Sequence, residues 1–347
     1  MARTLKMKRR KKMEKIRLGL IGCGGRMGAH MNSFEKMDDV QVVAVADPRE
    51  ERRLAAAERF GCTRIYKDHK ELYANESKET LDAVVIAVEP TAHDYMEEAA
   101  IDKDLPFLVE KPMAMDLNQA REIARRVKEK GLITAVGFQD RYIKLMEMVK
   151  EEVDKAPKGG LVYGAWVGGI PRVWWWQKKS TCGGQLVEQN IHLLDGLRWL
   201  YGEPLSVYAT ASTGMVKAGE NGVSPEYDTD DHSTAVIRFE NNVTATLVSG
   251  CYSKSVRPNC GLVITLPDMV LDYRLRNNLI IRTAQETRDI PREKDDHTYY
   301  LDAAFVHAVK TGDASRIRSP YEDALKSLEL GFAANESMES GQVIYFK

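Results

Sequence analysis

The sequence lacks the features that mark several specialised classes of protein. It has only five cysteines among 347 residues, scattered without a C-x-x-C pair, which argues against a disulfide framework and against structural zinc. It has no excess of one charge, because 50 Lys and Arg stand against 51 Asp and Glu, so no overall field attracts nucleic acid or an anionic membrane. No apolar run approaches the roughly 18 residues of a membrane span. We therefore expect no metal, no nucleic acid and no membrane, and a small molecule as the partner.

The start of the chain is charged and has no apolar segment. Residues 8–12 read Lys-Arg-Arg-Lys-Lys, and no stretch of about 7 to 15 apolar residues follows, so the pattern differs from a secretory signal. A basic disordered tail over residues 1–14 is expected, and binding to a polyanion is the alternative. Together with the missing membrane span, this start predicts a cytoplasmic protein.

Short apolar runs alternate with helical patterns in the first part of the chain, as in a parallel sheet covered by helices. The intervening helices are expected to end at Gly61 and before Gly131. The alternation predicts a doubly wound α/β domain of the Rossmann type over residues 15–140. The expected strands are 16–22, 41–46, 83–88, 105–109 and 133–137.

After Arg141 the pattern changes to longer strands with alternating apolar and polar residues. Residues 233–239 and 244–249 form two such strands joined by a short turn, which predicts a hairpin. We expect an α+β domain over residues 141–347 with a largely antiparallel open sheet. The few helical patterns in this part can cover only one portion of the sheet, so the rest is available to pair subunits in a homodimer or homotetramer.

A glycine-rich turn follows the first expected strand and precedes a helical pattern. Gly22 permits a tight turn, and Gly24 lets the backbone approach a pyrophosphate at the start of the helix. The third glycine of the usual dinucleotide fingerprint comes one residue late. The expected cofactor-binding loop consists of Gly22, Gly24, Gly25, Arg26 and Met27.

Asp47 ends the second expected strand, about 20 residues beyond the glycine turn. A carboxylate at this place accepts hydrogen bonds from the adenosine ribose hydroxyls and repels a 2′-phosphate, so NAD is favoured over NADP. Arg49 and Arg52 argue the other way, because either can meet a 2′-phosphate. A plain turn residue before Pro48 is the alternative for Asp47.

Two further segments carry residues suited to proton transfer. Lys111 lies between Glu110 and Pro112 at the end of an apolar strand, and a lysine beside a positively charged nicotinamide can exchange a proton with a substrate hydroxyl. Glu188 and His192 are spaced i and i+4, so on one helix they project from the same face. The alternatives are a surface lysine in a loop and a structural core histidine.

The glycine turn, the Glu110-Lys111 pair and the Glu188/His192 pair together resemble the glucose-fructose oxidoreductase, inositol dehydrogenase and rhizopine catabolism family (Gfo/Idh/MocA) over nearly the whole chain. The resemblance implies an NAD-dependent oxidoreductase that transfers hydride between nicotinamide and a secondary hydroxyl of a sugar, inositol or related polyol. Lys111, His192 and Glu188 would be catalytic, Glu110 would help to orient the cofactor, and His93 would lie near the cofactor edge. A structural role at the start of a helix is the alternative for His93. The chain departs from the family at Glu188, where aspartate is usual.

Three adjacent tryptophans, residues 174–176, lie upstream of Glu188. They cannot all face one core, so at least one is expected to line a cleft, where an indole packs well against the C–H face of a sugar. Aromatic packing between the domains is the alternative. The residues expected to contact substrate are Trp175, Trp176, Arg141 and His192.

Two other functions remain open at this stage. Some relatives with the same fold cleave a glycosidic bond through transient oxidation and leave NAD unchanged overall, which would make the chain an NAD-dependent glycosidase. A regulatory protein that binds NAD without turnover belongs to a different class, and the presence of Lys111, Glu188 and His192 argues against it.

Overall fold

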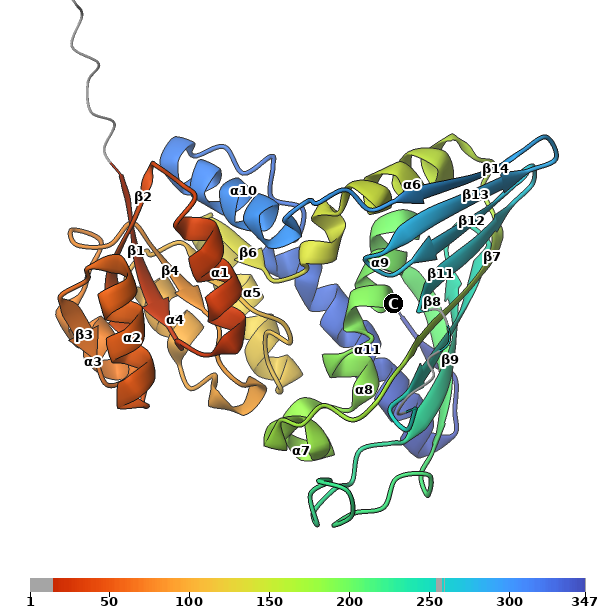
Figure 1. The fold of residues 1–347 in the computed structure, drawn as a ribbon, viewed down its shortest axis with the longest axis horizontal. Coiled ribbons are helices and arrows are strands. Elements are labelled where there is room, and N and C mark those ends of the chain that lie inside the picture. Colours follow the sequence, from red (N-terminus) through yellow and green to blue (C-terminus); the bar gives the residue numbers. More distant parts are fainter. Residues whose placement is uncertain (1–14, 254–257, 259, 347) are drawn as a thin grey trace, which may run out of the picture.

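The computed structural model describes residues 15–253, 258 and 260–346, so the basic segment predicted over 1–14 lies outside the described residues. Two sheets organise the chain, one of six strands near the N-terminus and one of nine strands after it (Figure 1). In the part of the chain that the structure describes, no helix is long and apolar enough to cross a membrane.

The first sheet is fully parallel and has the strand order β3-β2-β1-β4-β5-β6. Five of its strands lie where the apolar runs predicted them, and β3 was missed because three half-buried residues are too few to show a pattern. The order reverses between β1 and β4, which is the point where ligands bind in such sheets. The strands are β1 (Ile16–Ile21), β2 (Val40–Ala46), β3 (Arg64–Tyr66), β4 (Ala83–Ile86), β5 (Phe107–Val109) and β6 (Thr134–Val136).

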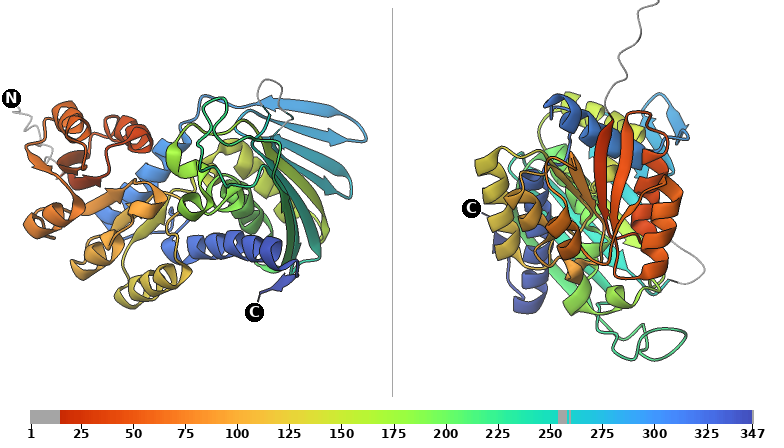
Figure 2. Two further views of the ribbon diagram at one scale, coloured as in Figure 1. Left: turned by 90° about the horizontal axis from the view of Figure 1, so that it is seen from below. Right: turned by 90° about the vertical axis from the view of Figure 1, so that its left-hand side faces the viewer.

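Helices cover both faces of this sheet (Figure 2). Gly61 and Gly131 end α2 and α5 in the left-handed conformation, as their positions predicted, because glycine adopts it at low cost. Asp116 begins α5 by accepting a hydrogen bond from the backbone N–H of Asn118 at 2.8 Å. The helices are α1 (Gly25–Phe34), α2 (Glu50–Phe60), α3 (His69–Asn75), α4 (Met96–Asp102) and α5 (Leu117–Lys130), with the short η1 (Pro90–Ala92) before α4.

The second sheet is mixed, with the order β14-β13-β12-β11-β7-β10-β9-β8-β15. Only β7 and β10 pair in parallel, and the predicted hairpin is confirmed as β9 and β10. The strands are β7 (Gly160–Val167), β8 (Pro204–Ser212), β9 (His232–Phe239), β10 (Val243–Gly250), β11 (Gly261–Leu266), β12 (Met269–Arg274), β13 (Asn278–Thr283), β14 (Thr287–Pro291) and β15 (Ile344–Tyr345).

Helices pack on one face of the second sheet (Figure 1). Among the described residues, no helix covers its far face (Figure 2). The helical segments of this half are η2 (Gln139–Tyr142), α6 (Lys144–Lys155), η3 (Trp174–Gln177), α7 (Lys179–Cys182), α8 (Gln185–Glu188), α9 (Ile191–Tyr201), α10 (His297–Thr311) and α11 (Tyr321–Ser340).

Two C-terminal helices return to the first sheet. Leu301 and Phe305 of α10 are fully buried in the core around β1 and α1, although they follow the second sheet in sequence. Helix α11 contributes Leu328 to the core of the first domain and Leu330 to the core of the second. The change of strand pattern after residue 141 therefore falls between the last strand of the first sheet and the first strand of the second, and the chain later contributes to both cores.

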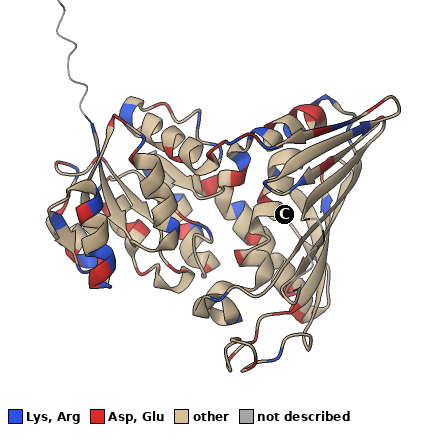
Figure 3. Cartoon of the chain, viewed as in Figure 1, with Lys and Arg blue, Asp and Glu red and all other residues tan. Residues whose placement is uncertain are grey.

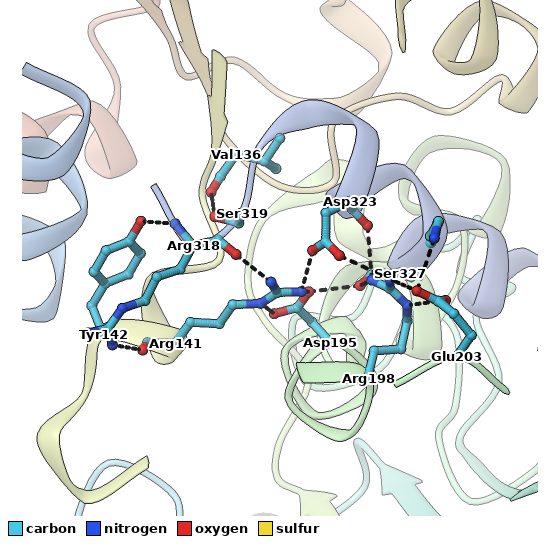
Figure 4. A network of polar contacts seen from close by, with 11 residues as sticks. Val136, Arg141, Tyr142, Asp195, Arg198, Glu203, Arg318, Ser319, Asp323 and Ser327 are labelled. Atoms are coloured by element: carbon cyan, nitrogen blue, oxygen red, sulfur yellow. Dashed lines mark hydrogen bonds and ion pairs between the residues drawn. The ribbon is translucent and has the colours of Figure 1, made fainter. Parts of the chain in front are cut away.

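A buried ion-pair network ties η2, α9 and α11 together (Figure 4). The guanidinium of Arg141 donates to both carboxylate oxygens of Asp195 at 2.7 Å and lies 2.7 Å from the carboxylate of Asp323. Ser327 donates a further 2.7 Å hydrogen bond to Asp195. Arg141 was predicted to contact substrate, but its guanidinium is enclosed by these partners, which favours a structural role.

We predict that Asp195→Ala lowers the free energy of unfolding by about 3 to 5 kcal/mol, because it leaves the buried guanidinium of Arg141 with one carboxylate fewer. Urea denaturation followed by circular dichroism measures the change. Glu122→Ala, which removes an exposed ion pair with Arg125 on α5, is the control and should have no measurable effect. An Asp195→Ala variant as stable as the wild type would contradict the structural role of the network.

Candidate active site

The glycine turn after β1 has the geometry of a phosphate-binding loop. Gly22 has a φ of +82°, and a Cβ there would lie 2.4 Å from the carbonyl oxygen of Ala87, so only glycine fits. Gly24 begins α1 without a side-chain cap, and the first turn of α1 holds no acidic residue. A Cβ on Gly25 would meet nothing within 4 Å. The first N–H groups of α1 are therefore open to the pyrophosphate of a dinucleotide.

The side chains of two predicted members of this loop, Met27 and Arg26, make contacts elsewhere in the protein. The side chain of Met27 is fully buried in the core beneath β1, so only its backbone can contact a cofactor. The side chain of Arg26 turns toward the end of β5, where its Nε donates to Glu110 at 2.7 Å.

Asp47 is held against the glycine turn. Its carboxylate accepts hydrogen bonds from the backbone N–H of Cys23 at 2.7 Å and of Arg49 at 2.8 Å. Each carboxylate oxygen has a second lone pair, so a ribose hydroxyl can still be bound. Burial and the charge of Asp47 raise the pKa of the Cys23 thiol to about 12, so this thiol stays protonated and is no nucleophile.

Glu110 lies at the centre of a buried charged cluster at the end of β5. Its Oε1 accepts from Arg26 and lies 3.0 Å from Nε2 of His30, while its Oε2 accepts from the backbone N–H of Lys111 at 3.2 Å. Burial opposes the charged form, but Arg26 and His30 lower the pKa of Glu110 to about 2. A Cβ on Gly137 would lie 2.5 Å from this carboxylate, so the backbone beyond β6 must be glycine there.

His30 extends the cluster to α10. Its Nδ1 lies 2.7 Å from Oδ1 of Asp302, and its side chain is fully buried. Burial opposes protonation, but Asp302 and Glu110 raise the pKa of His30 to about 9, so it bridges the two carboxyl groups as an imidazolium. The sequence analysis missed this residue. The available signal was a histidine on the apolar face of α1, and its partner lies 272 residues away, beyond any local pattern.

Lys111 forms an ion pair that joins the two halves of the site. Its Nζ donates to Oε1 and to the backbone carbonyl of Glu188, both at 2.7 Å. The other carboxylate oxygen of Glu188 accepts from the indole Nε1 of Trp176 at 2.6 Å. The structure thus brings together Lys111 and Glu188, as expected, and adds Trp176 as the residue that orients the carboxylate.

Glu188 and His192 do not share one continuous helix, so that expectation was wrong. Glu188 ends α8, and a turn at residues 189–190 separates it from α9. The backbone N–H of Asn190 bonds to the carbonyl of Gln185 at 2.8 Å, an i to i−5 contact that widens the turn. The spacing in sequence predicted neighbouring positions but not this break.

His192 is a buried, neutral histidine. Its ring stacks on Trp166 with centroids 6.1 Å apart and meets the edge of Phe138 at 6.2 Å. Burial and then the positive charges of Lys111 and Arg276 hold the pKa of His192 well below its usual range, so the ring accepts rather than carries a proton at neutral pH. Its Nδ1 forms no hydrogen bond to any residue that the structure describes, and Oδ2 of Asp140 lies 3.9 Å away.

Two further residues near His192 were missed by the sequence analysis. Arg276, in the turn between β12 and β13, pairs with Asp140 at 2.9 and 3.1 Å and lies over the ring of Trp166 at 5.6 Å. His297, at the start of α10, accepts from Arg292 at Nδ1, and burial lowers its pKa to about 4. Both come from turns or helix ends without a motif, so no sequence signal marked them.

The remaining predicted residues differ in burial and in hydrogen-bond partners. Trp176 is fully buried, so its indole face is not open to substrate, whereas Trp175 is half-buried and Trp174 is exposed. His93 follows η1 and pairs through Nδ1 with Glu97 at 2.6 Å, which fits a role at the start of α4 as well as one near a cofactor. Over the described ranges, no group of three His, Cys, Asp or Glu side chains is arranged to hold a metal ion.

Comparison with known proteins identifies the class and then the family. Residues 16–138 match a family model described as an oxidoreductase family with an NAD-binding Rossmann fold, and residues 161–265 match the Gfo/Idh/MocA C-terminal domain. The fold and the site therefore define an NAD-binding oxidoreductase. The chain belongs to the Gfo/Idh/MocA family and is a dehydrogenase that acts on CH–OH groups.

Relatives are similar along almost the whole chain. The myo-inositol 2-dehydrogenase of Thermotoga maritima is 24% identical and is matched over 93% of this chain and 96% of its own length. The scyllo-inositol 2-dehydrogenase (NAD(+)) of Bacillus subtilis is 23% identical over 95% and 96%. A levoglucosan dehydrogenase crystallised with NADH and L-sorbose shares the fold with a TM-score of 0.84, at 20% identity over 96% of this chain and all of its own.

We predict that the His30 imidazolium makes stability fall at alkaline pH. The folded pKa of about 9 lies above the ordinary value of 6.5, so the stabilisation is fully present below pH 6.5 and is lost as the pH rises through 9. The loss is on the order of 3 kcal/mol for a shift of this size. Denaturant unfolding at pH 6.5, 8 and 9.5 measures it.

His30→Gln keeps a hydrogen-bonding side chain but cannot carry the charge, so its stability should change far less over the same pH range. His307→Gln, which changes a partly exposed histidine at the end of α10, is the matched control and should follow the wild type. Parallel curves for wild type and His30→Gln would contradict the bridging imidazolium.

Proposed function

We propose that the protein transfers hydride between NAD and a secondary hydroxyl of a sugar, inositol or related polyol. The observation that carries the proposal is the contact between Lys111 and Glu188 at the end of β5, where Nζ and the carboxylate are 2.7 Å apart next to the neutral His192. The inositol and levoglucosan dehydrogenases among the relatives support a polyhydroxylated substrate.

The charges around the site favour a neutral, polyhydroxylated substrate. Cations and carboxylates are mixed over both halves of the chain (Figure 3), and each cation named around His192 and His297 has a carboxylate partner. An ion pair offers donors and an acceptor side by side, which suits hydroxyl groups that both donate and accept. The pairs are Lys111 with Glu188, Arg26 with Glu110, Arg276 with Asp140 and Arg292 with Asp295.

Lys111, Glu188 and His192 divide the proton chemistry between them. Bound NAD supplies the acceptor for the hydride. Lys111 takes the proton of the substrate hydroxyl at Nζ after passing one of its own to Oε1 of Glu188, 2.7 Å away. His192 is the second acceptor near the substrate. Asp47, held beside the glycine turn, supports the preference for NAD over NADP.

We predict that Lys111→Ala lowers kcat by about 10²-fold or more and leaves NAD affinity largely unchanged, because a general acid–base group typically contributes 10² to 10⁴. His192→Ala should lose a similar or smaller factor. Lys36→Ala, which changes an exposed lysine just after α1, serves as the control. Turnover is followed by NADH absorbance and NAD binding by calorimetry. Near wild-type turnover in Lys111→Ala would contradict the assignment of Lys111 as the proton acceptor.

The substrate must be identified first, and one screen separates the three functions. Sugars, inositols, sugar acids and aryl glycosides are incubated with NAD, and NADH and products are both measured. NADH formed in step with product supports the dehydrogenase. Glycoside cleavage with only catalytic NAD supports the redox-assisted glycosidase, and NAD binding without turnover across the panel supports the regulatory protein.

We also propose that the protein is a homo-oligomer that pairs through the far face of the second sheet. Tyr163, Val236 and Tyr208 lie in one row across β7, β10, β9 and β8 and are at least one-third exposed. Leu161 and Val248 extend this apolar face. Exposed apolar side chains gathered on one sheet face, here with Thr246 between Tyr163 and Val236, are typical of a protein–protein contact. A dimer and a tetramer remain the two options.

We predict that Tyr163→Lys converts the oligomer to a monomer, because it places a charge in the middle of the paired faces. The exposed side chain makes the change tolerable to the fold. Light scattering at micromolar protein measures the mass against 39.1 kDa for one chain. Leu54→Lys, at an equally exposed apolar position on α2, should leave the mass unchanged. A monomeric wild type would contradict the proposal.

A further inference from the structure

We propose that Asp140 is the positioning residue for His192, and that Arg276 holds Asp140 away from it until substrate takes over the arginine's hydrogen bonds. The inference rests on the proposed function, because it concerns the histidine of the same site. Neither Asp140 nor Arg276 belongs to the motifs that identify the family.

The imidazole of His192 is buried and lacks one hydrogen bond among the described residues. It is buried between Trp166 and Phe138, and its Nδ1 is inaccessible and bonds to no described residue. A buried polar nitrogen without a partner costs free energy, so the working state of the enzyme should supply one. A proton acceptor at Nδ1 would also fix which ring nitrogen faces the substrate.

The carboxylate of Asp140 is placed to accept this hydrogen bond from Nδ1 of His192 after a small shift. Its Oδ2 lies 3.9 Å from Nδ1, about one ångström beyond a hydrogen bond. A small cavity of about 10 Å³ is lined by both Asp140 and His192, so there is room for a shift of the carboxylate or for about one water. Asp140 is in turn almost fully buried, so it has few other choices of partner.

Arg276 is what keeps the two apart. Its Nε and Nη2 bond to the two oxygens of Asp140 at 2.9 and 3.1 Å, which aligns the carboxylate with the guanidinium. Arg276 also has a φ of +57°, an uncommon conformation for a residue with a side chain that costs on the order of 1 kcal/mol or more. Strained residues of this kind cluster where a side chain must be held in one place for function.

Arg276 is also partly exposed to solvent. Its side chain is 30% exposed, against 11% for Asp140, and it lies over the same Trp166 ring that stacks on His192. Nη1 of Arg276 donates to no described residue. Hydroxyl oxygens of a bound polyol can accept from this guanidinium, which loosens its hold on Asp140.

The released carboxylate then completes a proton acceptor. Asp140 accepts from Nδ1–H of His192, which leaves the lone pair on Nε2 as the second proton acceptor beside Lys111 and stabilises the imidazolium that forms when His192 takes up a proton. The other groups that act on His192 are the cations Lys111, Arg26 and Arg276, which cannot accept a proton, and His297, whose Nδ1 already accepts from Arg292. Proton affinity at His192 thus rises only when substrate is in place.

The first test does not depend on activity. In protein labelled with ¹⁵N-histidine, NMR titration reports the proton affinity and tautomer of His192, assigned with His192→Gln. Arg276→Met should raise the proton affinity at least about tenfold, because an opposite charge within about 4 to 6 Å acts on this scale. Asp140→Asn added to Arg276→Met should cancel most of the rise. Arg282→Met, an exposed arginine on β13, is the control and should change nothing.

The double variant decides between the proposal and simple removal of a positive charge. If Arg276→Met raises the proton affinity equally with and without Asp140, the carboxylate does not reach His192 and the proposal is wrong. If the single variant leaves the titration unchanged, it is also wrong.

The second test uses the substrate once it is known. Asp140→Asn should lower kcat about tenfold or more with little change in KM, and should move the acid side of the pH profile to lower pH. Wild-type kcat and an unchanged pH profile in Asp140→Asn would overturn the proposal while leaving the dehydrogenase assignment intact. Absence of turnover in every variant would instead count against the proposed function, and the NMR result would still decide the role of Asp140.

Discussion

The active site depends on one buried carboxylate, that of Glu110. It lies directly after β5, accepts from Arg26 and His30 of α1, contacts the backbone of Lys111 and fills the space that Gly137 leaves beyond β6. A buried carboxylate without these partners would be strongly disfavoured, so the first turn of α1, the end of β5 and the end of β6 can lie only where the charges meet. The position of Lys111 follows from this constraint.

The same rule, that a buried charge needs a partner, organises the rest of the site. Lys111 reaches Glu188, Arg276 reaches Asp140, and Arg141 reaches Asp195 deeper in the protein. The outcome is a site with many hydrogen-bonding groups and little net charge. His192 in its middle is the exception, because burial and then positive neighbours keep it neutral while its Nδ1 pairs with no described residue.

The fold was predictable from the sequence to the extent that local patterns encode it. Apolar runs located five parallel strands, and the hairpin of β9 and β10 followed from alternation. The glycine turn was found because the backbone there admits only glycine at Gly22, and the Glu110-Lys111 pair was found because it ends an apolar strand and resembles the family pattern. The partners His30–Asp302 and Asp140–Arg276 escaped, since each joins positions more than 130 residues apart. Trp176 and Arg141 are residue types suited to substrate contact, but the burial of Trp176 and its bond to Glu188, and the carboxylate partners of Arg141, favour positioning and packing.

Helix α11 sets the distance between the two halves of the enzyme. Its 20 residues span about 30 Å at 1.5 Å per residue, with one end in the core of the first domain and the other in the core of the second. Because one continuous helix enters both cores, a change in the distance between the two domains would require residues of α11 to leave one of them. The helix also fixes how the residues that face the first core are rotated about its axis relative to those that face the second. One residue inserted between Leu328 and Leu330 would turn the second half of α11 by about 100° relative to the first half, so that Leu330, Ala333 and Ala334 could no longer all face the core of the second domain while Leu328 faces that of the first.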